Sequence, residues 1–234
     1  PELETNQSID ISEQLLKKKR SELGSLPITF VAPTSNAFNM VRSSSLFNEN
    51  RIEKILLSTE DIFLSPIDRD IARTALNLPK GKKIIFFGAF NLMDKRKGGD
   101  LLLQALRMLK EKSEQSGSRL LDSVALVTIG NKDKFDIAEL PIEWIHLGMV
   151  TDSRLLRLIY YSADLYACPS IDDMGPLMIN ESYSCGLPIV SFQSGVGPDL
   201  IKNSVNGYLI EDYDVKLFSE GIYSIIKSDS LKSR

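Results

Sequence analysis

The sequence predicts an α/β fold in which a parallel sheet is covered by helices on both faces. From residue 81 onward, short apolar segments alternate with segments whose apolar residues recur about every three to four positions, the spacing of an amphipathic helix. The short segments are apolar almost throughout, which is typical of parallel strands buried on both faces. This order predicts a doubly wound, Rossmann-like domain that binds its ligands beyond the carboxyl ends of the strands.

The individual elements follow from the same patterns. Lys83 to Gly88 is predicted as the first buried strand, and leucines at positions 101, 102, 103, 106 and 109 predict a helix over residues 100–110. Either Thr151 or Asp152 is expected to cap the next helix, which runs through Ile159. The remaining predicted elements are strands at 124–130, 142–148, 164–168 and 188–192 and a helix at 177–184.

Residues 1–80 are organised differently. Helices are predicted at 8–24 and 35–45, and strands at 27–33 and 51–57. One strand–helix–strand unit buries too little apolar surface for an independent domain.

The first predicted helix carries the basic run Lys17-Lys18-Lys19-Arg20. A solvated helix face is the simpler interpretation of this run. A patch that meets anionic membrane lipids is the alternative.

Composition and charge limit the function classes. The 43% hydrophobic and 25% charged residues are those of an ordinary globular protein. The net charge of −3 argues against a nucleic-acid partner, because such proteins present a strongly basic surface. No apolar run approaches the roughly 18 residues of a membrane span, and no secretory signal opens the chain, so we expect a cytoplasmic protein. The first residue is proline, so we expect a fragment or a processed product.

The cysteine and histidine content argues against disulfides and metal sites. Cys168 and Cys185 are expected to be free thiols in a reducing cytosol. The single histidine, His146, lies within a predicted strand, where a neighbour is expected to satisfy its ring. No Cys or His cluster offers metal ligands, and the acidic residues lack the spacing of a divalent-ion site, so no metal is expected.

The most informative stretch runs from Pro169 to Ile210. It contains an acidic pair, Asp173 and Glu181, with seven residues between them. Carboxylates accept hydrogen bonds from sugar hydroxyls, and helix N-termini attract phosphate, so this arrangement suits a polyhydroxylated ligand that carries phosphate. The pair is followed by a turn at 185–188, an apolar run at 189–192 and a glycine-containing loop at 195–199.

This stretch resembles the donor-binding half of the retaining group 1 glycosyltransferases (glycosyltransferase family 4), enzymes of the GT-B type. The resemblance lies in four motifs in this order: acidic–x7–Glu, Cys-Gly-x-Pro-Ile-Val, Gly-x-Gly-x-Asp and Asn-Gly-Tyr-Leu-Ile. The resemblance implies that residues 81–234 are the nucleotide-sugar domain, the C-terminal half of a GT-B fold. It implies that residues 1–80 are a remnant of the acceptor domain with the interdomain linker, because Ala32-Pro33-Thr34-Ser35 and Phe63-Leu64-Ser65-Pro66 match family elements. On that comparison the chain lacks most of the acceptor domain and the last helices.

The resemblance implies roles for both acidic residues. Glu181 matches the residue that binds the ribose hydroxyls of the nucleotide. Asp173 matches a position, usually glutamate, that contacts the transferred sugar, and its side chain is one methylene shorter. Asp172 is a neighbouring substitute, and the alternative for Asp173 is a loop aspartate that caps the helix start at Gly175-Pro176.

The turn Met174-Gly175-Pro176-Leu177 matches a family element that lies against the donor sugar and diphosphate. It is expected to present backbone N–H groups and a helix N-terminus to the ligand. Pro176 removes one donor, which is harmless at the first helical position.

The resemblance also implies a phosphate-binding loop after the first strand. Gly88 ends that strand, and Lys97 matches the lysine that neutralises the departing nucleoside diphosphate. Many members carry an arginine just after the strand glycine, where this chain has Ala89-Phe90, and Arg96 is expected to supply the missing guanidinium. The alternative is a polar loop with three basic residues by chance.

Two further segments match the family more loosely. Gly148 and Val150 lie where the family seats the nucleobase. The loop from Gly195 to Asp199 resembles Gly-Gly-x-Pro-Glu with Asp in place of Glu. Its alternative is a strand-to-helix turn with Asp199 at the helix start.

The expected function is therefore retaining transfer from a nucleotide-diphosphate sugar to a glycan, a lipid-linked or another acceptor, in polysaccharide or glycoconjugate biosynthesis, without cofactor or metal. This chain is expected to bind the donor but to be inactive alone. Peripheral membrane contact, at the cytoplasmic face, is expected of the longer protein. The alternative is a non-catalytic nucleotide-sugar-binding module of the same fold, and a GT-B epimerase or phosphorylase is a third interpretation.

Overall fold

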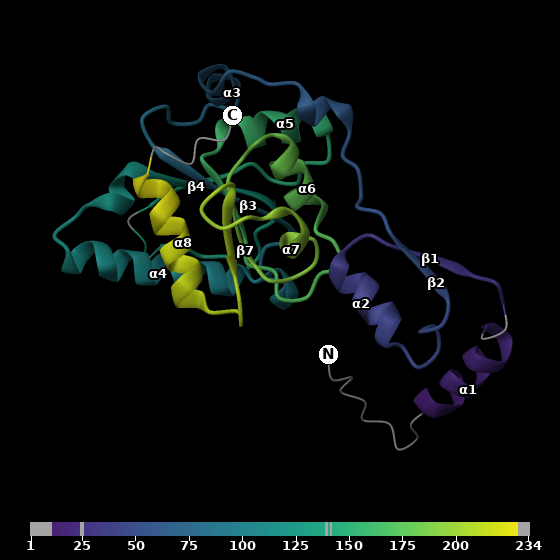
Figure 1. The fold of residues 1–234 in the computed structure, drawn as a ribbon. Coiled ribbons are helices and arrows are strands. Elements are labelled where there is room, and N and C mark those ends of the chain that lie inside the picture. The colour runs from purple at the N-terminus through teal and green to yellow at the C-terminus, as the bar shows by residue number, and fades with distance from the viewer. Residues whose placement is uncertain (1–10, 24–25, 139, 141, 229–234) are drawn as a thin grey trace.

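The computed structural model describes residues 11–23, 26–138, 140 and 142–228. Its main body is a parallel sheet covered by helices on both faces (Figure 1), which confirms the predicted fold class. The strands are β3 (Lys83–Asn91), β4 (Val124–Asn131), β5 (Glu143–His146), β6 (Leu165–Cys168), β7 (Ile189–Phe192) and β8 (Gly207–Ile210). Their order across the sheet is β5-β4-β3-β6-β7-β8, the doubly wound order in which the direction of winding reverses between the first and fourth strands, here β3 and β6.

The helices of this part follow the strands in the chain. They are α3 (Arg69–Ala75), α4 (Gly99–Gln115), α5 (Ser153–Ser162), α6 (Leu177–Ser184), α7 (Gly197–Leu200) and α8 (Val215–Lys227), with short 3-10 helices η1 (Asp61–Leu64), η2 (Lys95–Lys97) and η3 (Leu120–Ser123).

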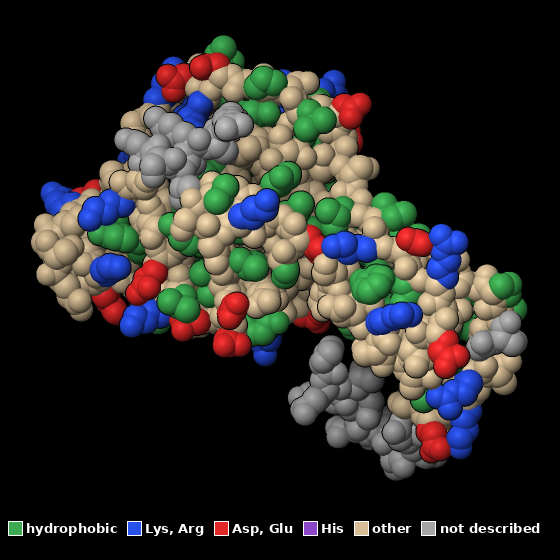
Figure 2. Space-filling view, viewed as in Figure 1, with side chains coloured by type: hydrophobic (Ala, Val, Ile, Leu, Met, Phe, Trp, Pro, Cys, Tyr) green, Lys and Arg blue, Asp and Glu red, His purple; other side chains and the backbone are tan. Residues whose placement is uncertain are grey.

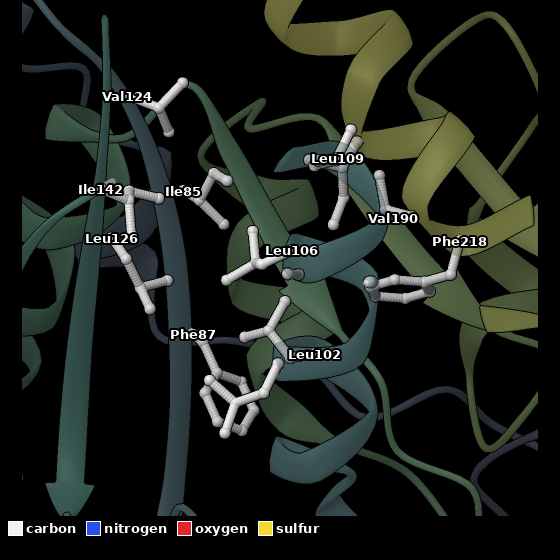
Figure 3. Packing of buried hydrophobic residues seen from close by; sticks show 14 of the residues in the cluster. Ile85, Phe87, Leu102, Leu106, Leu109, Val124, Leu126, Ile142, Val190 and Phe218 are labelled. Carbon is white, nitrogen blue, oxygen red and sulfur yellow. The ribbon is translucent and has the colours of Figure 1, made fainter. Parts of the chain in front are cut away.

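Strand β3 is apolar because both of its faces are buried. Ile85 and Phe87 point to one side of the sheet, where they pack with α4 and α8 (Figure 3). Ile84 and Phe86 point to the other side, where they pack with η1, α5 and α6. This alternation, with side chains on opposite faces at successive positions, divides the core into two layers and holds the strand ends in a fixed arrangement.

Each strand and helix predicted between residues 83 and 192 is present. Among the two candidate caps of α5 the structure selects Asp152, whose carboxylate accepts a hydrogen bond from the Arg154 backbone N–H at 2.8 Å. Strand β3 is longer than predicted and contains a register shift between Gly88 and Asn91, while β5 ends at His146.

Helices α3 and α8 and strand β8 are present in addition to the predicted elements. The side chains that α8 buries include Phe218, Ile222, Ile225 and Ile226, which have the spacing of one helical face. Strand β8 lies within the Asn-Gly-Tyr-Leu-Ile motif and pairs in parallel with β7 at the edge of the sheet.

The N-terminal part forms a small sheet of its own beside the large one (Figure 1). It consists of α1 (Ser12–Leu23), β1 (Thr29–Ala32), α2 (Ser35–Ser43) and β2 (Arg51–Lys54), and β1 pairs in parallel with β2. These four elements confirm the predicted ones, apart from residues 8–10 and 24 of the first helix, which lie outside the described residues.

Helix α1 buries none of its side chains, and its basic run is exposed to solvent. Two of the lysines have partners on the same helix, Lys17 with Glu13 at 2.7 Å and Lys18 with Glu22 at 3.9 Å. Basic and acidic side chains are accordingly mixed over α1 in Figure 2, which favours the solvated face. Within the described residues, the helices are all too short or too polar to cross a membrane.

Asp199 connects the two parts of the chain. Its carboxylate, almost fully buried, accepts hydrogen bonds from the Ser35 backbone N–H at 2.8 Å and the Ser35 hydroxyl at 2.5 Å. Lys54 Nζ lies 2.9 Å from the same carboxylate. Asp199 does lie in the short helix α7, as the alternative predicted, but its side chain holds the N-terminus of α2 and the end of β2.

Both cysteines are buried free thiols, as predicted. Burial raises the pKa of Cys185 to about 12, so this thiol stays protonated and unreactive at neutral pH.

Candidate functional site

The predicted site lies at the point where the strand order reverses. The loop after β3 contains Lys97, and the loop after β6 contains Asp173. Because β3 and β6 are parallel neighbours, both loops leave the sheet at the carboxyl ends of the strands. In doubly wound folds this crevice is the place where ligands bind.

Two glycines hold the loop after β3 close to the loop after β6. A Cβ atom on Gly98, which has a φ of 69°, would lie 2.0 Å from the carbonyl oxygen of Pro169. A Cβ atom on Gly99 would lie 1.8 Å from the Leu92 carbonyl oxygen. Only glycine fits at these two positions. The Ile171 backbone N–H also donates to the Arg96 carbonyl at 2.9 Å, so the two loops are joined along their backbones.

Lys97 and Asp173 form an ion pair across these loops. The second carboxylate oxygen of Asp173 accepts a hydrogen bond from the Gly175 backbone N–H at 3.1 Å. Asp173 does not cap α6, whose N-cap Pro176 receives no side-chain hydrogen bond, but it holds the loop before the helix and contacts the predicted phosphate-binding lysine.

Arg96 forms an ion pair with Asp94 of its own loop. Its guanidinium donates to the Asp94 carboxylate at 2.9 Å and is largely exposed. The hydrogen bond to Asp94 and the charge of that carboxylate raise the pKa of Arg96, with smaller contributions from Asp172 and Asp173. Arg96 lines a hollow of about 620 Å³ beside the ion pair, together with Asn36, Leu101, Ile171, Asp172, Asp173, Gln193, Ser194 and Tyr213.

Glu181 lies on α6 and is buried, with 7% of its surface exposed. Its Oε2 atom accepts a hydrogen bond from the Tyr160 phenol at 2.5 Å. Burial raises the pKa of Glu181, an effect that the Tyr160 hydrogen bond opposes and the nearby charge of Glu60 reinforces. Glu181 is not among the residues that line the hollow containing Arg96 and Asp173.

The turn between the two acidic residues contacts the N-terminal part of the chain. The Met174 carbonyl accepts a hydrogen bond from the Thr34 hydroxyl at 3.2 Å. Pro176 is the N-cap of α6 rather than its first helical residue, because Leu177 is the first with helical geometry. Pro176 was predicted as the first helical residue and lies one position before it. At this position its missing N–H still removes no helical hydrogen bond. Met174 and Leu177 are about half exposed.

Gly88 is buried in the middle of β3, before the register shift. A Cβ atom there would lie 2.6 Å from the Met178 side chain of α6. Gly88 therefore allows α6, which carries Glu181, to lie close over the strand.

The segment predicted to seat the nucleobase follows β5. Gly148 has a φ of 75°, and its carbonyl accepts a hydrogen bond from the Gly130 backbone N–H at 2.8 Å. Val150 is partly buried against the core layer that contains α5 and α6.

Thr128 of β4 joins two aromatic rings of the neighbouring strand β5. Its hydroxyl accepts from the Trp144 indole N–H at 2.8 Å and lies 3.0 Å from His146 Nδ1. The expectation that a neighbour satisfies His146 is confirmed. Burial lowers the pKa of His146, and the charge of Lys132 acts in the same direction.

Two features of the site were missed by sequence reasoning. Tyr160 precedes Glu181 by 21 residues, and no motif connects them. The contacts of Asp199 with Ser35 and Lys54 join positions more than 140 residues apart. Across the part of the chain that the structure describes, no three His, Cys, Asp or Glu side chains gather as metal ligands.

Comparison with known sequences identifies the class of protein. The profile of the family described as "Glycosyl transferases group 1" matches residues 68–234, and the chain belongs to this family. The predicted resemblance is thereby confirmed.

The chain is 30% identical over 190 residues to D-inositol 3-phosphate glycosyltransferase of Xylanimonas cellulosilytica, a match that covers 74% of this chain and 42% of that protein. It is 28% identical over 171 residues to the enzyme of the same name from Mycolicibacterium smegmatis, covering 71% and 37%. The chain thus spans about two fifths of the length of these curated relatives.

Solved structures share the fold. Sucrose-phosphate synthase from Thermosynechococcus elongatus superimposes with a TM-score of 0.74 at 17% identity, covering 97% of this chain and 56% of that chain. Anabaena HepE in complex with UDP-glucose superimposes with a TM-score of 0.68 at 18% identity, covering 94% and 60%. At these identities the likeness is one of fold.

Proposed function

We propose that this chain is the donor-binding part of a retaining glycosyltransferase and binds a nucleotide-diphosphate sugar where β3 and β6 diverge. The observation that carries the proposal is the meeting of Lys97 and Asp173 at this point of the sheet. The diphosphate would lie at Lys97 and the N-terminus of α6, the ribose at Glu181, and the sugar near Asp173. The base would lie along Gly148 to Val150.

The relatives support a sugar-nucleotide donor. Anabaena HepE was solved with UDP-glucose, and the curated relatives are named as glycosyltransferases. In the longer protein, an acceptor hydroxyl would attack the anomeric carbon on the face that the leaving group occupies. The bond from that carbon to the diphosphate would break, and the departing phosphate oxygen would take the hydroxyl proton. Lys97 would neutralise the charge that develops on the diphosphate.

The acceptor, the process and the location are part of the same proposal. We propose a glycan or lipid-linked acceptor, a role in polysaccharide or glycoconjugate biosynthesis, and a cytoplasmic protein whose longer form makes peripheral contact with the membrane. We propose that residues 81–234 form the donor domain and residues 1–80 belong to the acceptor side. Since a GT-B active site lies between two domains, the chain as it stands should bind donor without transferring the sugar.

A thermal-shift panel of UDP-, GDP- and ADP-sugars tests donor binding, because a ligand that binds only the folded state raises its stability by about 2.7 kcal/mol at a hundred times Kd. One donor should stabilise the chain, and Lys97→Ala and Glu181→Gln should weaken that effect at least tenfold in Kd. Lys95→Ala, which removes an exposed lysine of the same loop, is the control. Unchanged affinity in both variants would refute this site.

A second candidate function is a non-catalytic nucleotide-sugar-binding module. Its support is that Asp173 is held by Lys97 and Gly175, and that Phe90, 82% exposed, lies near the family's arginine position. Slow hydrolysis of the donor by the full-length protein separates the two functions. Hydrolysis above background supports the transferase, and binding without hydrolysis supports the module.

A further inference from the structure

Glu181 is a buried carboxylate with spare acceptor capacity. Its Oε2 atom accepts from Tyr160 at 2.5 Å, and among the described residues its Oε1 atom accepts no hydrogen bond. A carboxylate has about four acceptor positions, and buried polar groups are normally satisfied. Among the described residues the one fully buried side-chain nitrogen or oxygen without a partner is Ser182 Oγ, so Glu181 Oε1 is not sealed from solvent and is open to a ligand that donates hydrogen bonds.

Tyr160 is held too firmly to follow a moving carboxylate. Its side chain is 1% exposed and lies edge-on to three aromatic rings, Phe63 at 5.8 Å, Phe86 at 5.4 Å and Tyr166 at 6.5 Å between centroids. Burial and the charge of Glu181 raise the pKa of Tyr160 well above its ordinary value, so the phenol keeps its proton and always donates. The hydrogen bond therefore fixes one oxygen of Glu181 relative to the sheet.

We propose that Tyr160 is a positioning residue for donor binding: it occupies one oxygen of Glu181 and aims the other at the two ribose hydroxyls of the nucleotide. The proposal rests on the assignment of the ribose to Glu181 made above. Tyr160 does not touch the donor itself. It acts by keeping the Glu181 carboxylate ionised and in one orientation, so that the diol meets an acceptor that needs no rearrangement.

The same contact could simply hold α5 against α6. If the contact were only structural, Tyr160→Phe would change the affinity for all nucleotides equally or for none of them. The change would not depend on the ribose hydroxyls. A positioning role predicts an effect that disappears when those hydroxyls are removed.

The test compares Tyr160→Phe with Tyr161→Phe in the full chain. Tyr161, the next residue of α5, also donates a hydrogen bond, to the Phe63 carbonyl at 3.0 Å, and is the matched control. The Kd of UDP, GDP and ADP is measured by calorimetry, and the tightest binder is compared with its 2′,3′-dideoxy analogue. Tyr160→Phe should weaken the nucleoside diphosphate about tenfold and leave the dideoxy analogue unchanged. Tyr161→Phe should change neither.

Equal weakening of both ligands, or of neither, would overturn the proposal for Tyr160. If the unaltered chain binds none of the three diphosphates, the proposed function fails instead. The Glu181 carboxyl is then titrated by NMR in the chain and in Tyr160→Phe. A higher Glu181 titration midpoint in Tyr160→Phe supports the proposal that Tyr160 keeps this carboxylate ionised. An unchanged midpoint contradicts the proposal.

Discussion

Lys97 and Asp173 neutralise each other's charge in the folded chain. A nucleoside diphosphate at Lys97 would therefore compete with a built-in carboxylate or share the lysine with it. The short aspartate side chain is also bonded to the Gly175 backbone, so it is held within the loop. A glutamate, one methylene longer, would reach further from the same backbone. The aspartate thus explains why the lysine of this loop already has a partner.

The Asp173→Asn variant keeps the shape of this side chain and removes its charge. We expect it to raise the affinity for a nucleoside diphosphate several-fold, on the order of 1 kcal/mol, because the competing carboxylate is gone. Isothermal titration with the free diphosphate measures this. Asp133→Asn removes an exposed charge after β4 and should have no such effect. An unchanged or weaker affinity in Asp173→Asn would mean that Lys97 does not bind the diphosphate.

At the scale of elements, the loop between β3 and α4 depends on its approach to β6. Replacing Gly98 by alanine combines a left-handed backbone with a collision at the Pro169 carbonyl. We expect Gly98→Ala to lower the free energy of unfolding by about 3 kcal/mol and to weaken nucleotide binding, because the lysine loop must move away.

Gly117 is the matched control for this variant. It has a φ of 63°, close to that of Gly98, but no atom lies within 4 Å of the Cβ position. Gly117→Ala should therefore cost only about 1 kcal/mol in urea unfolding. Equal costs for both alanines would show that the approach to Pro169 does not constrain the loop.

The contact of α7 with α2 and β2 should depend on pH. Burial acts to raise the pKa of Asp199, but the hydrogen bonds from Ser35 and the contact with Lys54 outweigh it and lower the pKa. A lowered pKa in the folded state stabilises the protein above the unfolded value of about 3.9 and loses that contribution as the pH falls through the folded value.

Asp199→Asn should therefore cost about 2 kcal/mol at pH 7 and less at pH 3, as measured by urea unfolding at both values. Asp212→Asn, an exposed aspartate, is the control and should cost little at either pH. A cost for Asp199→Asn that does not change between pH 7 and pH 3 would contradict the ionic role of this contact.

At the scale of the whole molecule, the small sheet leaves edges unprotected. Within the described residues β1 and β2 pair only with each other, so each has a free edge, and Val31 of β1 is 60% exposed. Open edges with apolar side chains favour pairing between chains. We expect concentration-dependent self-association in sedimentation experiments, and Val31→Lys should reduce it. Leu64 is equally exposed but lies outside the strands, so Leu64→Lys should not reduce it. A chain that stays monomeric at all concentrations would contradict this.

The large sheet could be predicted from the sequence because the patterns that indicate its strands and helices lie within short segments. Continuous apolar runs such as 83–88, and leucine spacing such as that of 100–110, depend on neighbouring residues alone. Helix α8 has an equally local pattern at 218–226 and could have been predicted from it. The motifs also placed Lys97 and Asp173 on loops that do meet.

The remaining features depend on residues that are distant in sequence. The hydrogen bonds of Tyr160 with Glu181 and of Ser35 with Asp199 arise only when the strands have taken their order. Arg96 pairs with Asp94, two positions away, because η2 turns its side chain back along the loop. No spacing rule in the sequence predicts this contact with Asp94.

The Trp144–Thr128–His146 arrangement gives the molecule an optical probe. The sequence contains one tryptophan, so all indole emission arises from β5, four positions before Gly148. A protonated imidazole quenches indole emission, and the His146 ring centroid lies 5.9 Å from that of Trp144. Emission should therefore rise with pH through a midpoint below 6.5, the ordinary value for histidine. A nucleotide base seated beside β5 would shift that midpoint, so a fluorimeter alone could report where the donor lies.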